Sequence, residues 1–148
     1  MTDESPDEAQ QQPITQIPPC AQTLGWELVE LDAKAGRAEV AFEAKPEFTN
    51  PAGLVQGGFL AAMLDDVIGF TVGPSYGHGA IAASLEIKVS FLRPGRPGRI
   101  TGSARIVQRT ADTAFAEGEL RDGRGRLLAT ASSTLRILKA RQRPPRGK

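Results

Sequence analysis

The chain has 148 residues, which is the size of one domain. Hydrophobic residues make up 40% and charged residues 24%, with a formal net charge of +1, so neither a fully disordered chain nor a basic nucleic-acid-binding surface is expected. One cysteine, Cys20, and one histidine, His78, exclude an internal disulfide and a His/Cys zinc site. Any catalysis must use carboxylates, hydroxyls, amides and backbone groups, and we expect no metal or cofactor.

The two ends differ in composition from the middle. Residues 1–18 are rich in proline, glutamine and acidic side chains and are predicted to be disordered. Residues 139–148 form a basic tail, either a solubilising segment or a contact for an anionic ligand or partner. The acidic N-terminus is unlike a signal peptide, and the longest apolar run contains Asp65 and Asp66. We therefore expect one domain over 19–138, no membrane span and a cytoplasmic location.

Period-two alternation of apolar and polar residues dominates this domain and predicts strands. In the clearest run, Leu85, Ile87, Val89 and Phe91 fall on one face and Ser84 on the other. Asp122-Gly123 predicts a hairpin between the last two strands. The predicted strands cover residues 26–31, 37–42, 84–91, 99–109, 113–121 and 126–138.

One segment departs from the alternation. Residues 57–70 are rich in Ala, Leu and Met, which favours a helix, and they are apolar on almost every side. The helix is therefore expected to be buried. One helix with five or six antiparallel strands predicts an α+β fold in which the sheet wraps around the helix.

Asp65 and Asp66 lie inside this apolar helix. A carboxylate there has a high desolvation cost unless it is paired or faces a cavity or an interface. Consecutive helical residues point about 100° apart, so at least one of the two faces inward or toward an interface. One reading is a nucleophile or general base; the other is a solvated helix edge.

The helix begins at Gly57 and Gly58, preceded by a turn that starts at Asn50. Glycines in a first helical turn leave backbone N–H groups open to a ligand, and the helix dipole favours negative charge there. This arrangement suits an oxyanion hole for a thioester or ester carbonyl, although a plain glycine-rich turn has the same pattern.

Gly57 and Asp65 are separated by about 12 Å along one helix, at about 1.5 Å per residue. One carbonyl carbon cannot contact both groups of the same helix. If both act on it, two antiparallel helices must lie side by side, with Asp65 of one chain facing Gly57 of the other. The spacing therefore predicts a two-fold dimer with two shared sites.

A turn after the clearest strand carries Arg93, Arg96 and Arg99. Guanidinium groups suit bidentate binding of phosphate. The turn is either simply solvated or binds the phosphates of a nucleotide-containing substrate.

Taken together, these residues resemble the hotdog-fold acyl-CoA thioesterases of the phenylacetate-degradation (4-hydroxybenzoyl-CoA thioesterase-like) type. The resemblance covers about residues 22–138 and is most detailed over 50–94, including the motifs around Asn50, Gly57, Asp65 and Ser84. It implies an antiparallel sheet around a long helix, a homodimer that often pairs into a homotetramer, and hydrolysis of an acyl-CoA.

The resemblance also assigns roles to residues. Asp65 matches the nucleophile or general base, and Gly57 matches the N–H that polarises the thioester carbonyl. Asn50 matches a polar residue that positions the thioester or water, and Ser84 a hydroxyl that orients water. The arginine turn and Gly58 are assigned to substrate binding. Gln56 stands where members usually have histidine; its amide can donate a hydrogen bond but cannot titrate.

The sequence thus predicts an acyl-CoA thioesterase for a small or medium acyl group, aromatic or aliphatic. A non-catalytic acyl-CoA-binding or sensing module is the first alternative, motivated by Gln56. Another hotdog activity, such as an enoyl-thioester hydratase, is the second. The acyl group, the choice between dimer and tetramer, and the choice between covalent attack and activated water stay open.

Overall fold

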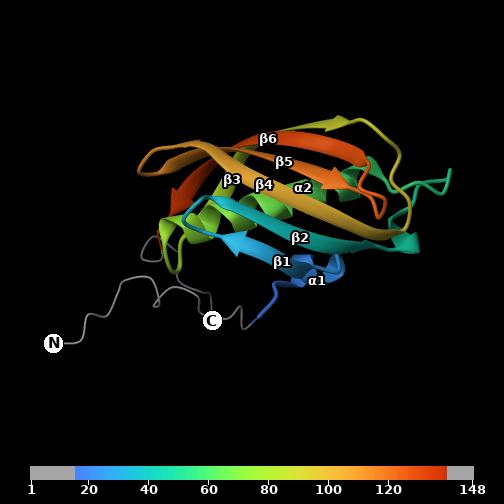
Figure 1. The fold of residues 1–148 in the computed structure, drawn as a ribbon, viewed down its shortest axis with the longest axis horizontal. Helices are drawn as coiled ribbons and strands as arrows, with labels where there is room; N and C mark the ends of the chain where they lie inside the picture. The colour runs from blue at the N-terminus through green and yellow to red at the C-terminus, as the bar shows by residue number, and fades with distance from the viewer. Residues whose placement is uncertain (1–15, 140–148) are drawn as a thin grey trace, which may run out of the picture.

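The structure, a computed structural model, describes residues 16–139. Residues 1–15, most of the segment predicted to be disordered, lie outside the described residues, as does the tail after Lys139. The first element, α1 (Pro19–Thr23), is a short helix that the sequence analysis did not predict. A sheet curves around a single long helix, α2 (Gly57–Val72) (Figure 1).

Six antiparallel strands form the sheet in the order β1-β2-β4-β5-β6-β3. Their bounds are β1 (Glu27–Asp32), β2 (Arg37–Ala44), β3 (Ile81–Phe91), β4 (Gly98–Arg109), β5 (Thr113–Arg121) and β6 (Leu127–Leu138). The predicted α+β hotdog fold is confirmed, and each predicted strand is present. The sheet is open, and its two edge strands are β1 and β3.

The helix packs on the inner face of the sheet. Met63, Leu64, Val67 and Ile68 are fully buried against large side chains from the strands. Gly118 on β5 allows close approach, because a Cβ there would lie 3.1 Å from Ile68 Cγ1. Burying four such side chains contributes roughly 1.5–3 kcal/mol each. The prediction of a buried helix is therefore confirmed.

Hydrogen bonds near both ends of α2 join it to the segments that connect the strands and to the start of β5. Before its first turn, the Val55 N–H donates to the Gly95 carbonyl at 2.9 Å. After its last turn, the chain enters the 3₁₀ turn η2 (Gly73–Tyr76), where the Tyr76 hydroxyl lies 2.8 and 3.0 Å from the carbonyl oxygens of Thr110 and Thr113. The helix is thus held in a fixed position across the sheet.

A β-bulge changes the expected pattern of β3. The pairing of β3 with β6 shifts between Ser84 and Glu86, which leaves Leu85 as an extra residue. Leu85 is 63% exposed, so its predicted place on the apolar face with Ile87 is wrong. Because the extra residue reverses the alternation, Ser84 and Ile87 can both face α2, which strict alternation forbids.

Glu86 supports the bulge with two contacts to β6. Its carbonyl accepts a hydrogen bond from the Ser133 hydroxyl at 2.7 Å, and its Oε1 accepts one from the Thr134 N–H at 2.9 Å. These bonds compensate for ladder bonds that the bulge disrupts.

The predicted hairpin between β5 and β6 is present, with a five-residue loop over 122–126. Asp122 Oδ1 accepts hydrogen bonds from the N–H groups of Arg124 at 2.9 Å and Arg126 at 3.0 Å. The glycine with a positive φ is Gly125 (φ +77°) rather than Gly123. The Asp-Gly pair therefore marks the hairpin, but the turn needs its glycine two residues later.

Within residues 16–139, α2 and the shorter helices are all too short or too polar to cross a lipid bilayer.

Candidate active site

Asp65 and Ser84 meet on the β3 side of α2. The Ser84 hydroxyl donates a hydrogen bond of 2.6 Å to Asp65 Oδ1. Asp65 is exposed in the single chain. The carboxylate is therefore oriented by a neighbouring hydroxyl and keeps Oδ2 for another contact.

Asp66 points to the other flank of α2, toward the β1 side of the sheet. It is half-buried near Trp26, whose ring packs edge-on against Phe70 with centroids 5.1 Å apart. Its Oδ1 atom is buried and has no hydrogen-bond partner among residues 16–139. Burial and the nearby charge of Asp65 raise the pKa of Asp66 to about 6, against a lowering by the Trp26 side chain. The two adjacent acids thus occupy different environments.

The start of α2 presents free donors. Gln56 is the N-cap residue, and its side chain makes no capping hydrogen bond. Its carbonyl accepts hydrogen bonds from the N–H groups of Phe59 and Leu60, whereas within the described part of the chain the N–H groups of Gly57 and Gly58 have no partner. Such free donors at a helix start are suited to an oxygen that carries negative charge.

An aromatic ring borders this donor site. A Cβ built on Gly57 would lie 3.1 Å from Cζ of Phe91, at the end of β3. The Phe91 side chain is nevertheless 54% exposed. In the sequence, Phe91 is only one member of an apolar strand face, and residue types give no sign of its contact with the helix start.

Asn50 organises the turn that leads into α2. Its Oδ1 accepts hydrogen bonds from the N–H of Ala52 at 3.0 Å and that of Leu54 at 3.2 Å, and its own N–H donates to the Leu54 carbonyl. These contacts occupy the carbonyl end of the side chain and leave Nδ2 without a partner among residues 16–139. Asn50 therefore has a structural role in the turn, and its amide nitrogen can still donate.

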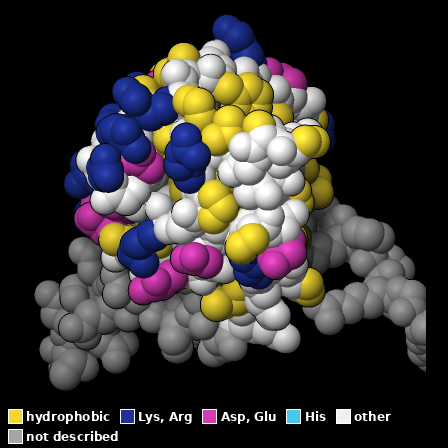
Figure 2. All heavy atoms as spheres, turned by 90° about the vertical axis from the view of Figure 1, so that its right-hand side faces the viewer, with side chains coloured by type: hydrophobic (Ala, Val, Ile, Leu, Met, Phe, Trp, Pro, Cys, Tyr) yellow, Lys and Arg dark blue, Asp and Glu magenta, His cyan; other side chains and the backbone are white. Residues whose placement is uncertain are grey.

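The three arginines predicted to bind substrate, Arg93, Arg96 and Arg99, do not form one cluster. Arg93 and Arg96 are exposed on the segment between β3 and β4, which is held beside the start of α2 through Val55 and Gly95. Arg99 lies on β4 and forms an ion pair with Glu27 at 3.1 Å. Viewed toward this end, basic side chains cluster next to exposed hydrophobic ones (Figure 2).

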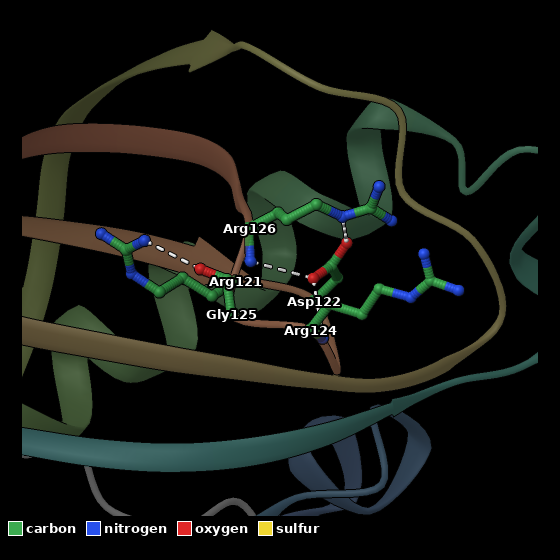
Figure 3. Close-up of polar contacts among 5 residues, drawn as sticks. All are labelled: Arg121, Asp122, Arg124, Gly125 and Arg126. Atoms are coloured by element: carbon green, nitrogen blue, oxygen red, sulfur yellow. Dashed lines mark hydrogen bonds and ion pairs between the residues drawn. The ribbon is translucent and has the colours of Figure 1, made fainter.

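The β5–β6 loop adds arginines that the sequence analysis missed. The Arg93 N–H donates to the Leu128 carbonyl at 3.1 Å, so this loop lies beside the Arg93 segment. Arg124 and Arg126 extend in the same direction from it (Figure 3). Asp122 pairs with Arg126 at 2.8 Å, and its pKa is lowered mainly by the Arg126 N–H. The position of these loop arginines depends on the pairing of the strands, which residue types alone do not reveal.

Within one chain, then, the structure joins Asp65 to Ser84 and places Gly57 beside Phe91, while Gly57 and Asp65 remain two helical turns apart. Among residues 16–139, no group of three His, Cys, Asp or Glu side chains is arranged to hold a metal ion.

Comparison with known proteins places this chain in a family. The family model of the thioesterase superfamily matches residues 52–129. A thioesterase-type, phenylacetic acid degradation-related protein of Ralstonia eutropha JMP134 is 40% identical, with a TM-score of 0.78 over 82% of this chain and 91% of that chain.

Two further relatives are more distant. An esterase-like protein of Saccharolobus solfataricus is 26% identical over 111 residues, which are 75% of this chain and 79% of the relative. A Streptococcus mutans UA159 protein, solved bound to acetyl-CoA, is 21% identical with a TM-score of 0.68 and shares the fold over 77% of this chain and 89% of that one. The chain therefore belongs to the thioesterase superfamily and is a thioester hydrolase with the hotdog fold.

Proposed function

We propose that the protein hydrolyses an acyl-CoA to the free acid and CoA, with Asp65 as nucleophile or general base. The observation that carries this proposal is the Asp65 carboxylate, oriented by Ser84 on a largely apolar helix that begins with two free N–H donors. The acetyl-CoA bound to the Streptococcus mutans relative supports a CoA thioester as the substrate class.

The Gly57 N–H would donate a hydrogen bond to the thioester carbonyl oxygen and stabilise the negative charge that develops on it. Asp65 would then act in one of two ways. Its carboxylate attacks the carbonyl carbon, the C–S bond breaks, CoA leaves as a thiolate that takes a proton, and water hydrolyses the resulting anhydride. Alternatively, Asp65 removes a proton from water, and the hydroxide attacks the carbonyl with the same loss of CoA.

Asn50 and Ser84 support either route. The free Nδ2 of Asn50 can hold the thioester or water near the helix start, and Ser84 fixes one oxygen of the Asp65 carboxylate. Gln56 can donate through its uncapped amide but cannot exchange a proton. Gly58, which has space above it, would let the substrate approach the backbone.

The two halves of the site would come from two chains. Gly57 and Asp65 are about 12 Å apart on a helix that is tied at both ends. The β3 strand ends the sheet and carries exposed Ile81 and Leu85, features that a second copy would cover. We therefore propose a homodimer formed along β3, which can pair further into a homotetramer.

Arg93 and Arg96 are proposed to bind the phosphates of CoA, with Arg124 beside them. None of the three has an acidic partner among residues 16–139. Arg99 is the weaker candidate, because Glu27 already neutralises it.

The decisive experiment is an acyl-CoA panel that varies chain length and aromaticity, with free thiol as the readout. We expect turnover with at least one member, and a loss of about 10²–10⁴-fold in the Asp65→Asn variant. Absence of turnover above buffer, or full activity of Asp65→Asn, would contradict the proposal. Tight binding of an acyl-CoA without product would instead favour the non-catalytic module.

Shared sites can be tested by mixing inactive variants. Gly57→Pro removes the N–H donor, and Asp65→Asn removes the acid. After subunit exchange, half of the dimers are mixed and each has one intact site, so about a quarter of wild-type activity should return. No recovery, despite exchange shown by mass spectrometry, would mean that each chain supplies a whole site.

A further inference from the structure

Phe91 is an exposed aromatic side chain at the end of β3. Its ring reaches the first turn of α2, where Cζ, Cε1 and Cε2 lie 3.1–3.5 Å from the position of a Gly57 Cβ. Glycine at 57 is what permits this contact, because any side chain would press against the ring.

The hydrophobic core does not require this ring. More than half of its surface is exposed, and the next residue, Leu92, is 58% exposed. Adjacent exposed apolar side chains beside a polar site are typical of a ligand surface. One edge of the Phe91 ring borders the Gly57 donor site, and much of the rest is exposed in the single chain.

The position of Phe91 in the sequence places it between the Gly57 donor site and the proposed phosphate-binding arginines. Arg93 follows two residues later, on the segment held beside α2 by the Val55–Gly95 hydrogen bond. Phe91 therefore bridges the donor for the carbonyl and the arginines proposed for the phosphates. In a CoA thioester, the pantetheine arm, a chain of alkyl and amide groups, joins these two parts.

We propose that Phe91 is a specificity-determining residue that packs against the pantetheine arm next to the thioester sulfur. This inference rests on the proposed function. The ring would hold the arm by apolar and amide–aromatic contact.

The test compares three thioesters of one acyl group, chosen from those that the wild type hydrolyses: the CoA, the pantetheine and the ethanethiol thioesters. For Phe91→Ala, kcat/KM should fall about tenfold or more on the first two, mainly through KM. It should stay within about twofold on the ethanethiol thioester, which has no arm. Phe91→Leu should fall between Phe91→Ala and the wild type.

Phe115→Ala is the matched control, since Phe115 is another exposed phenylalanine on a strand of the same sheet, away from the α2 start. It should leave all three substrates unchanged. Circular dichroism and light scattering should show that Phe91→Ala keeps the fold and oligomeric mass of the wild type.

Two results would overturn the inference: equal loss on all three substrates, or a change of oligomeric mass. Calorimetry gives a readout independent of turnover, because Phe91→Ala should also bind pantetheine and CoA more weakly. If the wild type hydrolyses no thioester at all, the proposed function fails; if only the selectivity among thiol arms is absent, the role of Phe91 fails.

Discussion

The Ser84 hydroxyl donates a hydrogen bond of 2.6 Å to the Asp65 carboxylate, and the β-bulge at Leu85 is what allows Ser84 to face the helix. Without the extra residue, Ser84 would lie on the opposite side of β3 from Ile87. The bulge thus converts a residue of the polar strand face into a neighbour of the proposed acid.

Replacement of Ser84 tests this relationship. Ser84→Ala removes the donor, so the carboxylate loses one fixed orientation, and kcat should fall about tenfold with little change in KM. Steady-state kinetics with the best acyl-CoA provides the measurement. Ser90→Ala, on the same strand, is the control and should behave like the wild type; a normal kcat for Ser84→Ala would show that Ser84 has no part in the reaction.

Asp66 should make stability depend on pH. Because its pKa is about 6 in the folded chain and 3.8 for an ordinary solvated aspartate, the folded state binds more protons between these values. Stability should therefore fall as pH rises from about 4 to about 6 and stay lowered above that range.

The Asp66→Asn variant should lose this pH dependence and, at pH 8, be more stable than the wild type by roughly 1–2 kcal/mol after allowance for solvent screening. Urea unfolding at pH 4, 6 and 8 measures both effects. An unchanged profile in Asp66→Asn would assign the dependence to other groups.

Two substitutions at Gly57 separate the N–H donor from the space around it. Gly57→Pro deletes the N–H, and proline is well tolerated at the first helical position, after Gln56 in an extended conformation (ψ 135°). Its kcat should fall about 10²–10³-fold.

Gly57→Ala keeps the donor but adds a methyl group 3.1 Å from the Phe91 ring, whose tip must shift by a few tenths of an ångström. It should therefore lose much less activity than Gly57→Pro, with both variants folded by circular dichroism. Equal kinetics for the two variants would mean that the Gly57 N–H is not the oxyanion donor.

If Arg93 and Arg96 bind the phosphates of CoA, the KM for an acyl-CoA should depend on salt. The double substitution of Arg93 and Arg96 by Gln should raise KM for an acyl-CoA about tenfold at low ionic strength and leave kcat almost unchanged. The difference should shrink as salt is added, because exposed charges are screened.

Arg99→Gln is the matched control for this experiment, because Arg99 is already paired with Glu27. An acyl-pantetheine, which lacks the nucleotide, should be hydrolysed equally by the double variant and the wild type. If its KM rises as much as that of the acyl-CoA, the arginines do not act on the phosphates.

The sequence predicts the fold of this chain well, for physical reasons. Alternation over 37–42 and 113–121 reflects strands with one buried face, and the all-round apolarity of 57–70 reflects a helix enclosed by a sheet. Helix α1 was missed because its five residues are too few to show periodicity. The bulge at Leu85 was missed because it depends on pairing with β6, far away in sequence.

For the site, spacing and resemblance predict roles for Asp65, Ser84 and Gly57, but not how these residues are arranged. The contact of Phe91 with Gly57 and the position of Arg124 beside Arg93 depend on strand and loop neighbours from distant parts of the chain. The hydrogen bonds that the side-chain oxygen of Asn50 accepts depend on the conformation of its turn, which residue types alone do not specify.

The separation of Gly57 and Asp65 along α2 would have a genetic consequence for the proposed dimer. Because Gly57 and Asp65 lie about two turns apart on one helix, activity in the proposed dimer would depend on how two copies fit together. Harmful alleles should then arise also along the outer edge of β3, in residues that do not touch the substrate.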